Sequence, residues 1–435
     1  MNKSANDYFR MLDEMYATRT MNSPCFTNEE LQKLPNILEL IEQLQDLELD
    51  VTTNSNDIEL FNLNPIKSIY CSDRIYANEA DENQFIVNRM QSGRFCFKPN
   101  LKSHRFLFRG QNQHYPLINS SFERRTADEK LLSNIQIGDF VSMLRTHPLF
   151  MMFERGIHLS PAKKPFFFEM NYYGIAQHYN FHTGMVDFTS DILAAAFFAT
   201  TTNRGDDKYE VYDGDSKYGV IYVHDINPRA TFKMCGYRNI GLQIYPRTGA
   251  QRGFCYQEDW RNIPVEKTVK PNFFRHDSKC SAIIFEKMRQ GELLFPKDDL
   301  SALSNEIRHS NSVTGISFCN NLYHNQDEIQ VSLDRLKDMG IKIDWHEKKF
   351  FTEDMLKQYY ENIKNGWWEE FCNQIAFEDE NEKELMESLL ALPKNPHYRQ
   401  FFEPNQLRFL HYFNMEERNN VMNIRKDKEY RNKGI

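Results

Sequence analysis

The sequence predicts an α+β protein in which a mixed domain of strands and helices lies between two helical flanking regions. Three observations support this fold class. Apolar residues recur at helical spacing in both flanks. Segments rich in Ile, Val and Tyr, which are typical of strands, gather in the middle of the chain. Helical patterns also precede these strands within the same central region, so we expect both element types in one domain.

The length of the chain predicts more than one domain. Its 435 residues exceed a single ordinary core, and two or three domains are expected. We expect a helical N-terminal segment at 1–65, a mixed domain at 66–310 and a helical region at 311–435. The hydrophobic content of 40% is enough to form a buried core, so the chain is expected to be globular.

Charge and cysteine usage exclude several classes of protein. The net charge of -8, from 53 basic and 61 acidic residues, argues against a uniformly basic surface, so nucleic acid is not an expected partner. The eight cysteines are scattered without a Cys-x-x-Cys pair, which predicts reduced thiols and no metal site. The most apolar run, at 192–199, is too short to span a bilayer. We therefore expect a cytoplasmic protein without a membrane partner.

The N-terminal flank carries the signals of two helices. Thr27 and Glu30 form a capping-box pattern, and Pro35 interrupts the helix that it opens. A stripe at helical spacing follows and predicts either core packing or a surface for a protein partner; it consists of Ile37, Leu40, Ile41, Leu44 and Leu47. The polar residues 52–57 are expected to form a linker.

The central region alternates between strand and helix signals. Residues 105–109 are expected to form a buried strand that Gly110 ends, and Thr126 with Glu129 should open a helix. A second helix is expected at 163–181. Ser190 and Asp191 can cap a third at 192–199, which is apolar on every face and so should be buried. Strands are then expected at 218–226, 242–245 and 282–286.

From residue 298 onward the pattern is again mainly helical. Leu300, Leu303 and Ile307 share one helical face, and Gly340 is expected to end a second helix. Helices are also expected at 352–412, and a solvated tail at 418–433.

Arg109 is the first candidate site residue because a charged side chain at the end of an apolar strand needs an ion-pair partner or a ligand. Its planar guanidinium can grip a pyrophosphate or a carboxylate through two parallel hydrogen bonds. An internal ion pair with Asp187 or Glu123 explains the same residue equally well. Arg109, Gly110 and Gln111 are therefore a candidate binding element.

A second group of polar residues surrounds a turn before the apolar helix. His178 follows Gln177 on a predicted helix, and Asp187, Thr189 and Ser190 come within a dozen residues. Hydroxyls and main-chain N–H groups at such a turn can hold a polar ligand. The alternative is structural: a core histidine and an anchoring aspartate.

A third group lies at 247–254, where Gln251 stands between glycines and can hydrogen-bond a ligand amide or hydroxyl. A surface hairpin with a polar tip is the alternative. A fourth segment, Leu-Phe-Pro at 294–296 followed by two aspartates, is expected to be structural, a strand that ends in proline and leads into a capped helix.

These segments closely resemble the FRG domain, a family named for its Phe-Arg-Gly tripeptide and found largely in bacteria. The resemblance is carried by Leu-Phe-Arg-Gly-Gln at 107–111, by the motifs within 174–199, by Ala-Gln-Arg-Gly-Phe at 250–254 and by Leu-Phe-Pro at 294–296. It covers about residues 66–310, and the flanks match no family.

The order of these motifs is also similar, more distantly, to that of ADP-ribosyltransferases. This resemblance implies that Arg109 holds the phosphates of NAD, that Thr189 and Ser190 frame the ribose and that His178 orients a hydroxyl. It also implies a carboxylate that stabilises an oxocarbenium-like transition state. The sequence departs from the pattern here, since the third motif offers the neutral Gln251; Asp187, Glu258 and Glu286 are the acidic alternatives.

Three functions remain open on these residues. One is an NAD-consuming transferase or glycohydrolase, acting as a toxin or phage-defence effector, with His178, Asp187 and Gln251 as catalytic candidates. Another is a sensor that binds NAD, ADP-ribose or a similar nucleotide without turnover. The last is an interaction module in which Arg109 and Asp187 form an internal pair.

Overall fold

The computed structural model describes residues 23–54, 81–89, 93–101, 106–158, 165–226, 236–257, 264–322, 327–346, 350–376 and 380–403. The chain divides into two compact units. Unit 1 comprises residues 1–119, 185–297 and 375–378, and unit 2 comprises residues 120–184, 298–374 and 379–435. Both units contain helices and strands, so the α+β class is confirmed. The predicted division at residues 65 and 310 stays a prediction.

Unit 1 is built on a six-stranded sheet in which every pair of neighbouring strands is antiparallel. The strand order is β10-β7-β3-β4-β9-β8. The strands are β3 (Phe106–Gln111), β4 (Val186–Thr189), β7 (Tyr218–Asp225), β8 (Tyr237–Asn239), β9 (Gly253–Tyr256) and β10 (Lys270–Arg275). The strands predicted at 105–109 and 218–226 are confirmed over residues 106–109 and 218–225, although β3 continues through Gly110 to Gln111.

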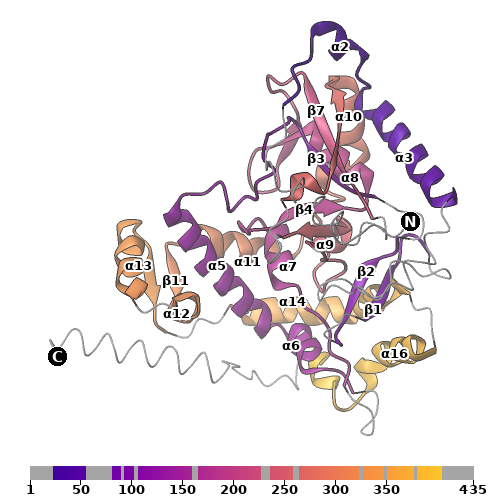
Figure 1. The fold of residues 1–435 in the computed structure, drawn as a ribbon. Helices are drawn as coiled ribbons and strands as arrows, with labels where there is room; N and C mark the ends of the chain where they lie inside the picture. Colours follow the sequence, from indigo (N-terminus) through magenta and orange to yellow (C-terminus); the bar gives the residue numbers. More distant parts are fainter. Residues whose placement is uncertain are drawn as a thin grey trace, which may run out of the picture. The chain divides into compact units, whose positions relative to one another are not determined.

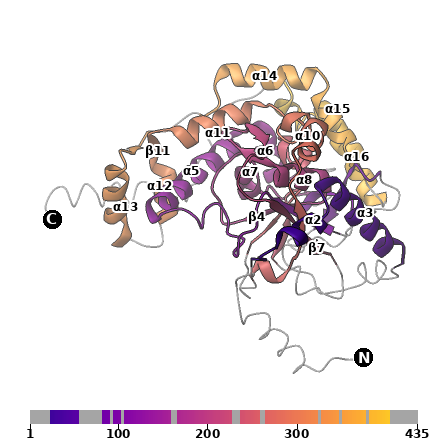
Figure 2. The same cartoon turned by 90° about the horizontal axis from the view of Figure 1, so that it is seen from above.

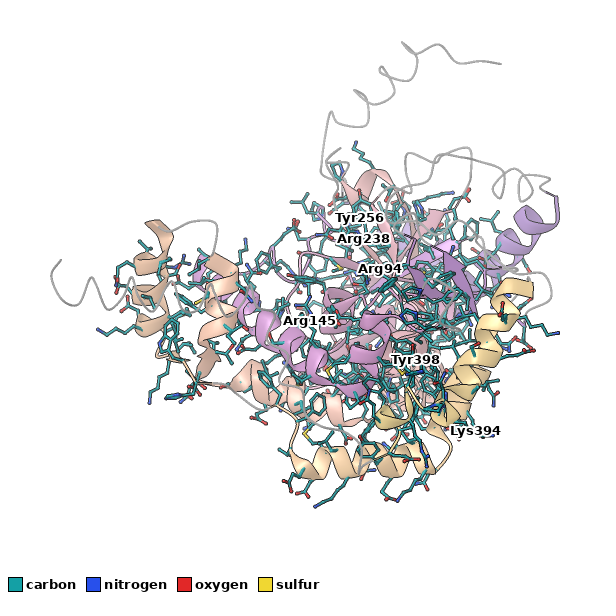
Figure 3. The ribbon with its side chains drawn as sticks, turned by 90° about the horizontal axis from the view of Figure 1, so that it is seen from below. Arg94, Arg145, Arg238, Tyr256, Lys394 and Tyr398 are labelled. Carbon is teal, nitrogen blue, oxygen red and sulfur yellow. The ribbon has the colours of Figure 1, made fainter. Side chains whose placement is uncertain are left out.

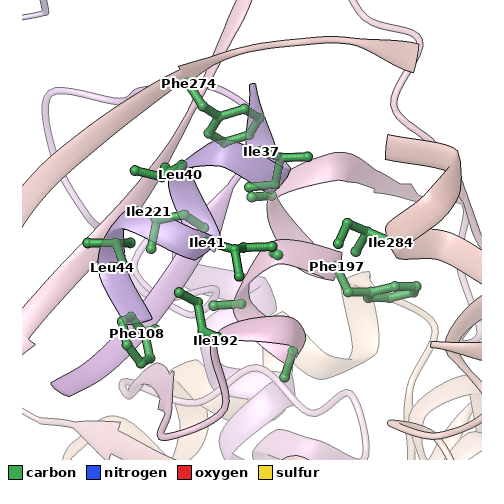
Figure 4. Packing of buried hydrophobic residues seen from close by; sticks show 14 of the residues in the cluster. Ile37, Leu40, Ile41, Leu44, Phe108, Ile192, Phe197, Ile221, Phe274 and Ile284 are labelled. Carbon is green, nitrogen blue, oxygen red and sulfur yellow. The ribbon is translucent and has the colours of Figure 1, made fainter. Parts of the chain in front are cut away.

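One face of this sheet is covered by helix α8 (Ile192–Thr200), with α3 (Ile37–Asn54) and α10 (Ser278–Lys287) beside it (Figures 1 and 4). The Asp191 side chain caps α8 by accepting from Leu193 N, and the helix body is buried as predicted. The predicted stripe of α3 packs here through Ile37, Leu40, Ile41 and Leu44. Leu47 is 46% exposed, so its predicted packing as part of the stripe was wrong.

The opposite face of the sheet carries a second core, formed by alternate residues of the same strands. Leu107 of β3, Val220 of β7 and Phe188 of β4 belong to it, and the short 3-10 helix η2 (Val265–Lys267) adds Val265. Residues at even positions of β3, such as Phe106 and Phe108, face α8 instead. This alternation fixes the face on which each functional side chain lies.

The remaining elements of unit 1 are short. They are α2 (Asn28–Lys33), β1 (Phe85–Arg89), β2 (Phe95–Pro99), β5 (Thr201–Asn203), β6 (Tyr209–Val211), α9 (Arg247–Ala250), η3 (Arg289–Gly291) and β13 (Ile375–Ala376). β1 pairs with β2 and β13, and β5 pairs with β6. The capping box of Thr27 and Glu30 at α2 is confirmed.

Unit 2 is mainly helical. Its elements are α5 (Ala127–Thr146), α6 (Pro148–Arg155), α7 (Tyr172–His178), α11 (Asp299–His309), β11 (Ser312–Thr314), α12 (Gly315–Leu322), α13 (Asp327–Asp338), β12 (Lys342–Asp344), α14 (Glu353–Lys364), α15 (Trp367–Asn373), α16 (Glu380–Ala391), η4 (Leu392–Lys394) and η5 (Arg399–Phe401). α5 and α11 lie side by side (Figure 2), and Gln136 of α5 donates to the carbonyl of Ile307. The predicted capping box at Thr126 is confirmed, and the capped helix expected after Pro296 is α11, which Asp298 caps.

Several predicted elements differ from the structure. Residues 282–286 belong to helix α10, because Asp277 caps that helix and accepts from two of its N–H groups. Residues 242–245 make only an isolated bridge to Phe97. The helix expected at 163–181 is reduced to α7: Pro165 opposes helix continuation, Phe166 bridges to Ile157, and residues 163–164 lie outside the described part. The expected linker begins late, since α3 runs to Asn54; residues 55–57 lie outside the described part.

No helix within the described residues is long and apolar enough to cross a membrane. The six cysteines of the described part form no disulfide with one another. Cys71 and Cys235 lie outside it.

We expect the stability of unit 2 to depend on pH through His147. Its ring is buried against Phe150, Phe351 and Tyr359, and burial lowers its pKa to about 3. The unfolded chain therefore binds one more proton below the unfolded pKa of about 6.5. Stability is fully present above that pH, and we expect it to fall by up to about 1.4 kcal/mol per pH unit between pH 6.5 and 3.

Denaturant unfolding at a series of pH values measures this dependence. His147→Asn is the matched variant, because asparagine keeps an N-cap acceptor for α6 but does not titrate. In the variant, the pH dependence of the free energy of unfolding should correspond to the uptake of about one proton fewer on unfolding than in wild type. An unchanged pH profile would show that other groups cause it.

Candidate functional site

Arg109 lies on β3, on the face of the sheet opposite to α8. Its neighbours at alternate positions, Leu107 and Gln111, share that face, because side chains alternate along a strand. The guanidinium is half-buried, and its Nη1 donates to the main-chain carbonyl of Asp187 at 2.9 Å. This bond to the neighbouring strand fixes the orientation of the charged group.

A buried carboxylate belongs to the same face. Glu266 is only 5% exposed and sits in η2, next to Val265 of the second core. Its Oε1 accepts from the main-chain N–H of Ile118 at 2.6 Å, while its Oε2 has no hydrogen-bond partner among the described residues. A buried carboxylate with one oxygen lacking a donor is energetically costly, and such groups are typical of functional sites.

The charges of both Arg109 and Glu266 act on the pKa of Tyr222. It stands directly opposite Arg109 in the pairing of β3 with β7, and its side chain is fully buried. Burial is the main reason that the pKa of Tyr222 is raised above its usual range; the charge of Glu266 raises it further and that of Arg109 lowers it. The phenol therefore stays protonated at neutral pH and can donate a hydrogen bond.

His114 and Gln111 complete this group. The His114 ring lies 6.3 Å from that of Tyr222, and burial lowers the pKa of the imidazole, which is therefore neutral at pH 7. In the part of the chain that the structure describes, neither His114 Nε2 nor Gln111 Oε1 has a hydrogen-bond partner. We name Arg109, Gln111, His114, Tyr222 and Glu266 the Arg109 cluster.

Asp187 and Thr189 lie on the other face of the sheet. Thr189 pairs with Phe108, which faces α8, so Asp187 and Thr189 point to the α8 side while Phe188 faces the second core. On that side Asp187 is in register with Cys255, and Cys255 is in register with Arg238 of β8. Figure 3 labels Arg238 of β8 and Tyr256 of β9, which belong to paired strands. The predicted set around Arg109 is thus divided between the two faces.

The hydroxyl turn after β4 is tied to the third motif. Thr189 donates from Oγ1 to the carbonyl of Gln251 at 2.7 Å, and Ser190 N donates to the carbonyl of Arg252. The Gln251 side chain is buried and donates to the carbonyl of Leu294 at 3.0 Å. These bonds give Thr189, Ser190 and Gln251 a structural task.

The third motif is not a hairpin tip. Its residues form the short helix α9 and a turn that leads into β9. The buried Arg247 makes an ion pair with Asp207 at 2.7 Å and lies over the ring of Phe295. In the fourth motif, residues 291–295 form turns instead of the predicted strand, and Asp298 caps α11 as expected.

His178 and Gln177 belong to unit 2, whereas the other predicted site residues belong to unit 1. Both lie in the last turn of α7, which Asn171 caps by accepting from Gly174 N. His178 is buried, and Gln177 accepts a hydrogen bond from the Thr183 hydroxyl. Their assignment to the site stays a prediction.

The sequence alone did not identify Glu266, Tyr222 or His114 as site residues. Tyr222 sits within an apolar strand and Glu266 in a segment without a recognisable motif, so only the strand register and burial single them out. Of the acidic alternatives, Glu286 is exposed on α10, and Glu258 lies outside the described residues.

Comparison with protein families supports the resemblance of the motifs. The model of the FRG domain matches residues 104–208, a range that includes Arg109, His178, Asp187, Thr189 and Ser190. Tyr222, Gln251 and Glu266 lie outside it. No curated protein and no solved structure matches the chain. The chain therefore contains an FRG domain at residues 104–208.

Proposed function

We propose that the Arg109 cluster binds NAD and cleaves the bond between its ribose and nicotinamide. The observation that carries this proposal is the buried Glu266, whose Oε2 has no partner among the described residues and whose charge acts on the pKa of Tyr222, as the charge of Arg109 does. Cleavage of NAD needs a cation that binds the pyrophosphate and a carboxylate near the ribose. The guanidinium of Arg109 and the carboxylate of Glu266 are two such groups on the same face of the sheet.

Arg109 is proposed to hold the pyrophosphate. A guanidinium matches two phosphate oxygens through parallel N–H bonds, and the bond to the Asp187 carbonyl orients the group in advance. Preorganisation of this kind reduces the entropy lost on binding. The neutral His114 and the Gln111 carboxamide can bind ribose hydroxyls or phosphate oxygens nearby.

Glu266 is proposed to stabilise the positive charge that develops at the ribose carbon. When the glycosidic bond breaks, its electron pair leaves with nicotinamide, and the ribosyl group becomes oxocarbenium-like. A water or an acceptor hydroxyl then adds to that carbon and loses its proton to a base, a task that the carboxylate can perform. Such turnover would deplete NAD, as expected of a toxin or phage-defence effector.

Incubation with NAD tests this function, with free nicotinamide measured by chromatography. We expect wild-type protein to release nicotinamide, and Arg109→Ala to lose that activity because the pyrophosphate is no longer held. Arg275→Ala is the matched control, since Arg275 lies on the edge strand β10 of the same sheet and outside the cluster. Release that is equal in wild type and Arg109→Ala would contradict the assigned role.

A non-catalytic nucleotide sensor is the second candidate. It is favoured by the division of the predicted residues: Thr189 and Gln251 make structural hydrogen bonds, and the Asp187 side chain points to the α8 side, away from the Arg109 guanidinium. This function predicts saturable binding of ADP-ribose, lost in Arg109→Ala, without release of nicotinamide from NAD.

A further inference from the structure

The segment that precedes α2 crosses the sheet face on which the Arg109 cluster lies. Tyr218 and Phe273 occupy that face, and the ring of Phe26 packs edge-on against them at 5.1 and 5.5 Å. The Tyr218 hydroxyl donates to the carbonyl of Pro24 at 3.2 Å. Residues 23–26, which we name the strap, therefore pack on these two aromatic rings beside the Arg109 cluster.

The strap reaches the cluster itself at His114. The hydroxyl of Ser23 lies 3.1 Å from His114 Nδ1, and the His114 ring lies 5.6 Å from Phe273 and 6.3 Å from Tyr222. Ser23 thus occupies one ring nitrogen of a residue that we assign to ligand binding. A ligand that used this nitrogen would have to displace Ser23.

Among the described residues, the strap makes fewer contacts than the chain that follows it. Ser23 and Cys25 are exposed, and the described contacts of the strap are one aromatic side chain and two hydrogen bonds. By contrast, the carbonyl of Pro35 accepts from Arg275 N at 2.9 Å, and α3 is anchored in the core on the other face. Segments with few buried contacts open locally at low free energy while their surroundings stay folded.

We propose that the strap is a removable cover that closes the His114 side of the Arg109 cluster. In the closed position it blocks His114, and in the open position the cluster accepts its nucleotide. The regulation of binding rests on the proposed function, but the opening of the strap does not. The two can therefore be tested separately.

Acylation of His114 by diethyl pyrocarbonate, followed residue by residue with peptide mass spectrometry, measures the opening. We expect Phe26→Ala to raise the rate at His114 about tenfold, because the aromatic anchor is lost. Tyr218→Phe removes only the hydroxyl bond to Pro24 and should give a smaller rise, about two- to fivefold. Acylation of the exposed His309 measures the activity of the reagent, and acylation of the buried His147 would indicate unfolding.

Tyr173→Ala, which removes an exposed aromatic ring of unit 2, is the control variant and should leave His114 unchanged. If the acylation rate of His114 were unchanged in both Phe26→Ala and Tyr218→Phe, with His147 still protected, the proposal that the strap covers His114 would be wrong. ADP-ribose affinity is measured on the same proteins, and we expect it to rise severalfold when the strap is loosened. Faster acylation with no ADP-ribose binding in any protein would support the cover and contradict the proposed function.

Discussion

Gly110→Ala is expected to destabilise unit 1 by at least about 3 kcal/mol, because the new methyl group has no space. A Cβ at this position would lie 1.8 Å from the carbonyl oxygen of Ala195 and 2.9 Å from Ala199 N. Both are main-chain atoms of α8, which cannot rotate away as a flexible side chain could. The helix would have to move off the sheet.

Gly184→Ala is the matched control, since a Cβ there meets nothing within 4 Å. Thermal or denaturant unfolding should show a large loss for Gly110→Ala and little change for Gly184→Ala. A Gly110→Ala protein as stable as wild type would mean that α8 does not pack directly on β3. The close approach also explains why a glycine follows Arg109: it allows helix packing, in addition to any role at a ligand.

Glu266→Gln is expected to lower the turnover of NAD by about 10²–10³-fold, the usual effect of removing one group that stabilises transition-state charge. Glutamine has nearly the same shape and can still accept from Ile118 N, so the fold of this segment should be retained. It carries no negative charge and therefore cannot stabilise the oxocarbenium-like state. Affinity for ADP-ribose should change little, because the charge is needed in the transition state.

Glu286→Gln provides the control for this prediction. Glu286 is exposed on α10, was an acidic alternative from the sequence, and should keep full activity when neutralised. Initial rates of nicotinamide release at saturating NAD measure both variants. If Glu286→Gln lost activity and Glu266→Gln kept it, the catalytic role would belong to Glu286 of α10.

Local signals in the sequence predicted much of the fold. The capping boxes at Thr27 and Thr126, the buried helix after Asp191 and the strand at Arg109 all follow from short-range patterns, and the structure contains each of them. The strand predicted at 282–286 failed because Ile283 and Ile284 favour strands by composition, whereas Asp277 starts a helix five residues earlier.

The site was harder to predict, because it depends on register. Arg109 and Asp187 both lie on neighbouring strands, yet the pairing of Phe108 with Thr189 sends the Asp187 side chain to the α8 face. A shift of one residue would have placed it beside Arg109. Glu266 is distant from Arg109 in the sequence, and only its burial and its hydrogen bond from Ile118 N reveal it.

A crystal structure of the protein with bound ADP-ribose tests the central claim most directly. We predict that the pyrophosphate lies on the guanidinium of Arg109 and the ribose near Glu266, on the sheet face opposite to α8, with the Ser23 to His114 contact broken. ADP-ribose bound on the α8 face, beside Asp187 and Thr189, would contradict this account.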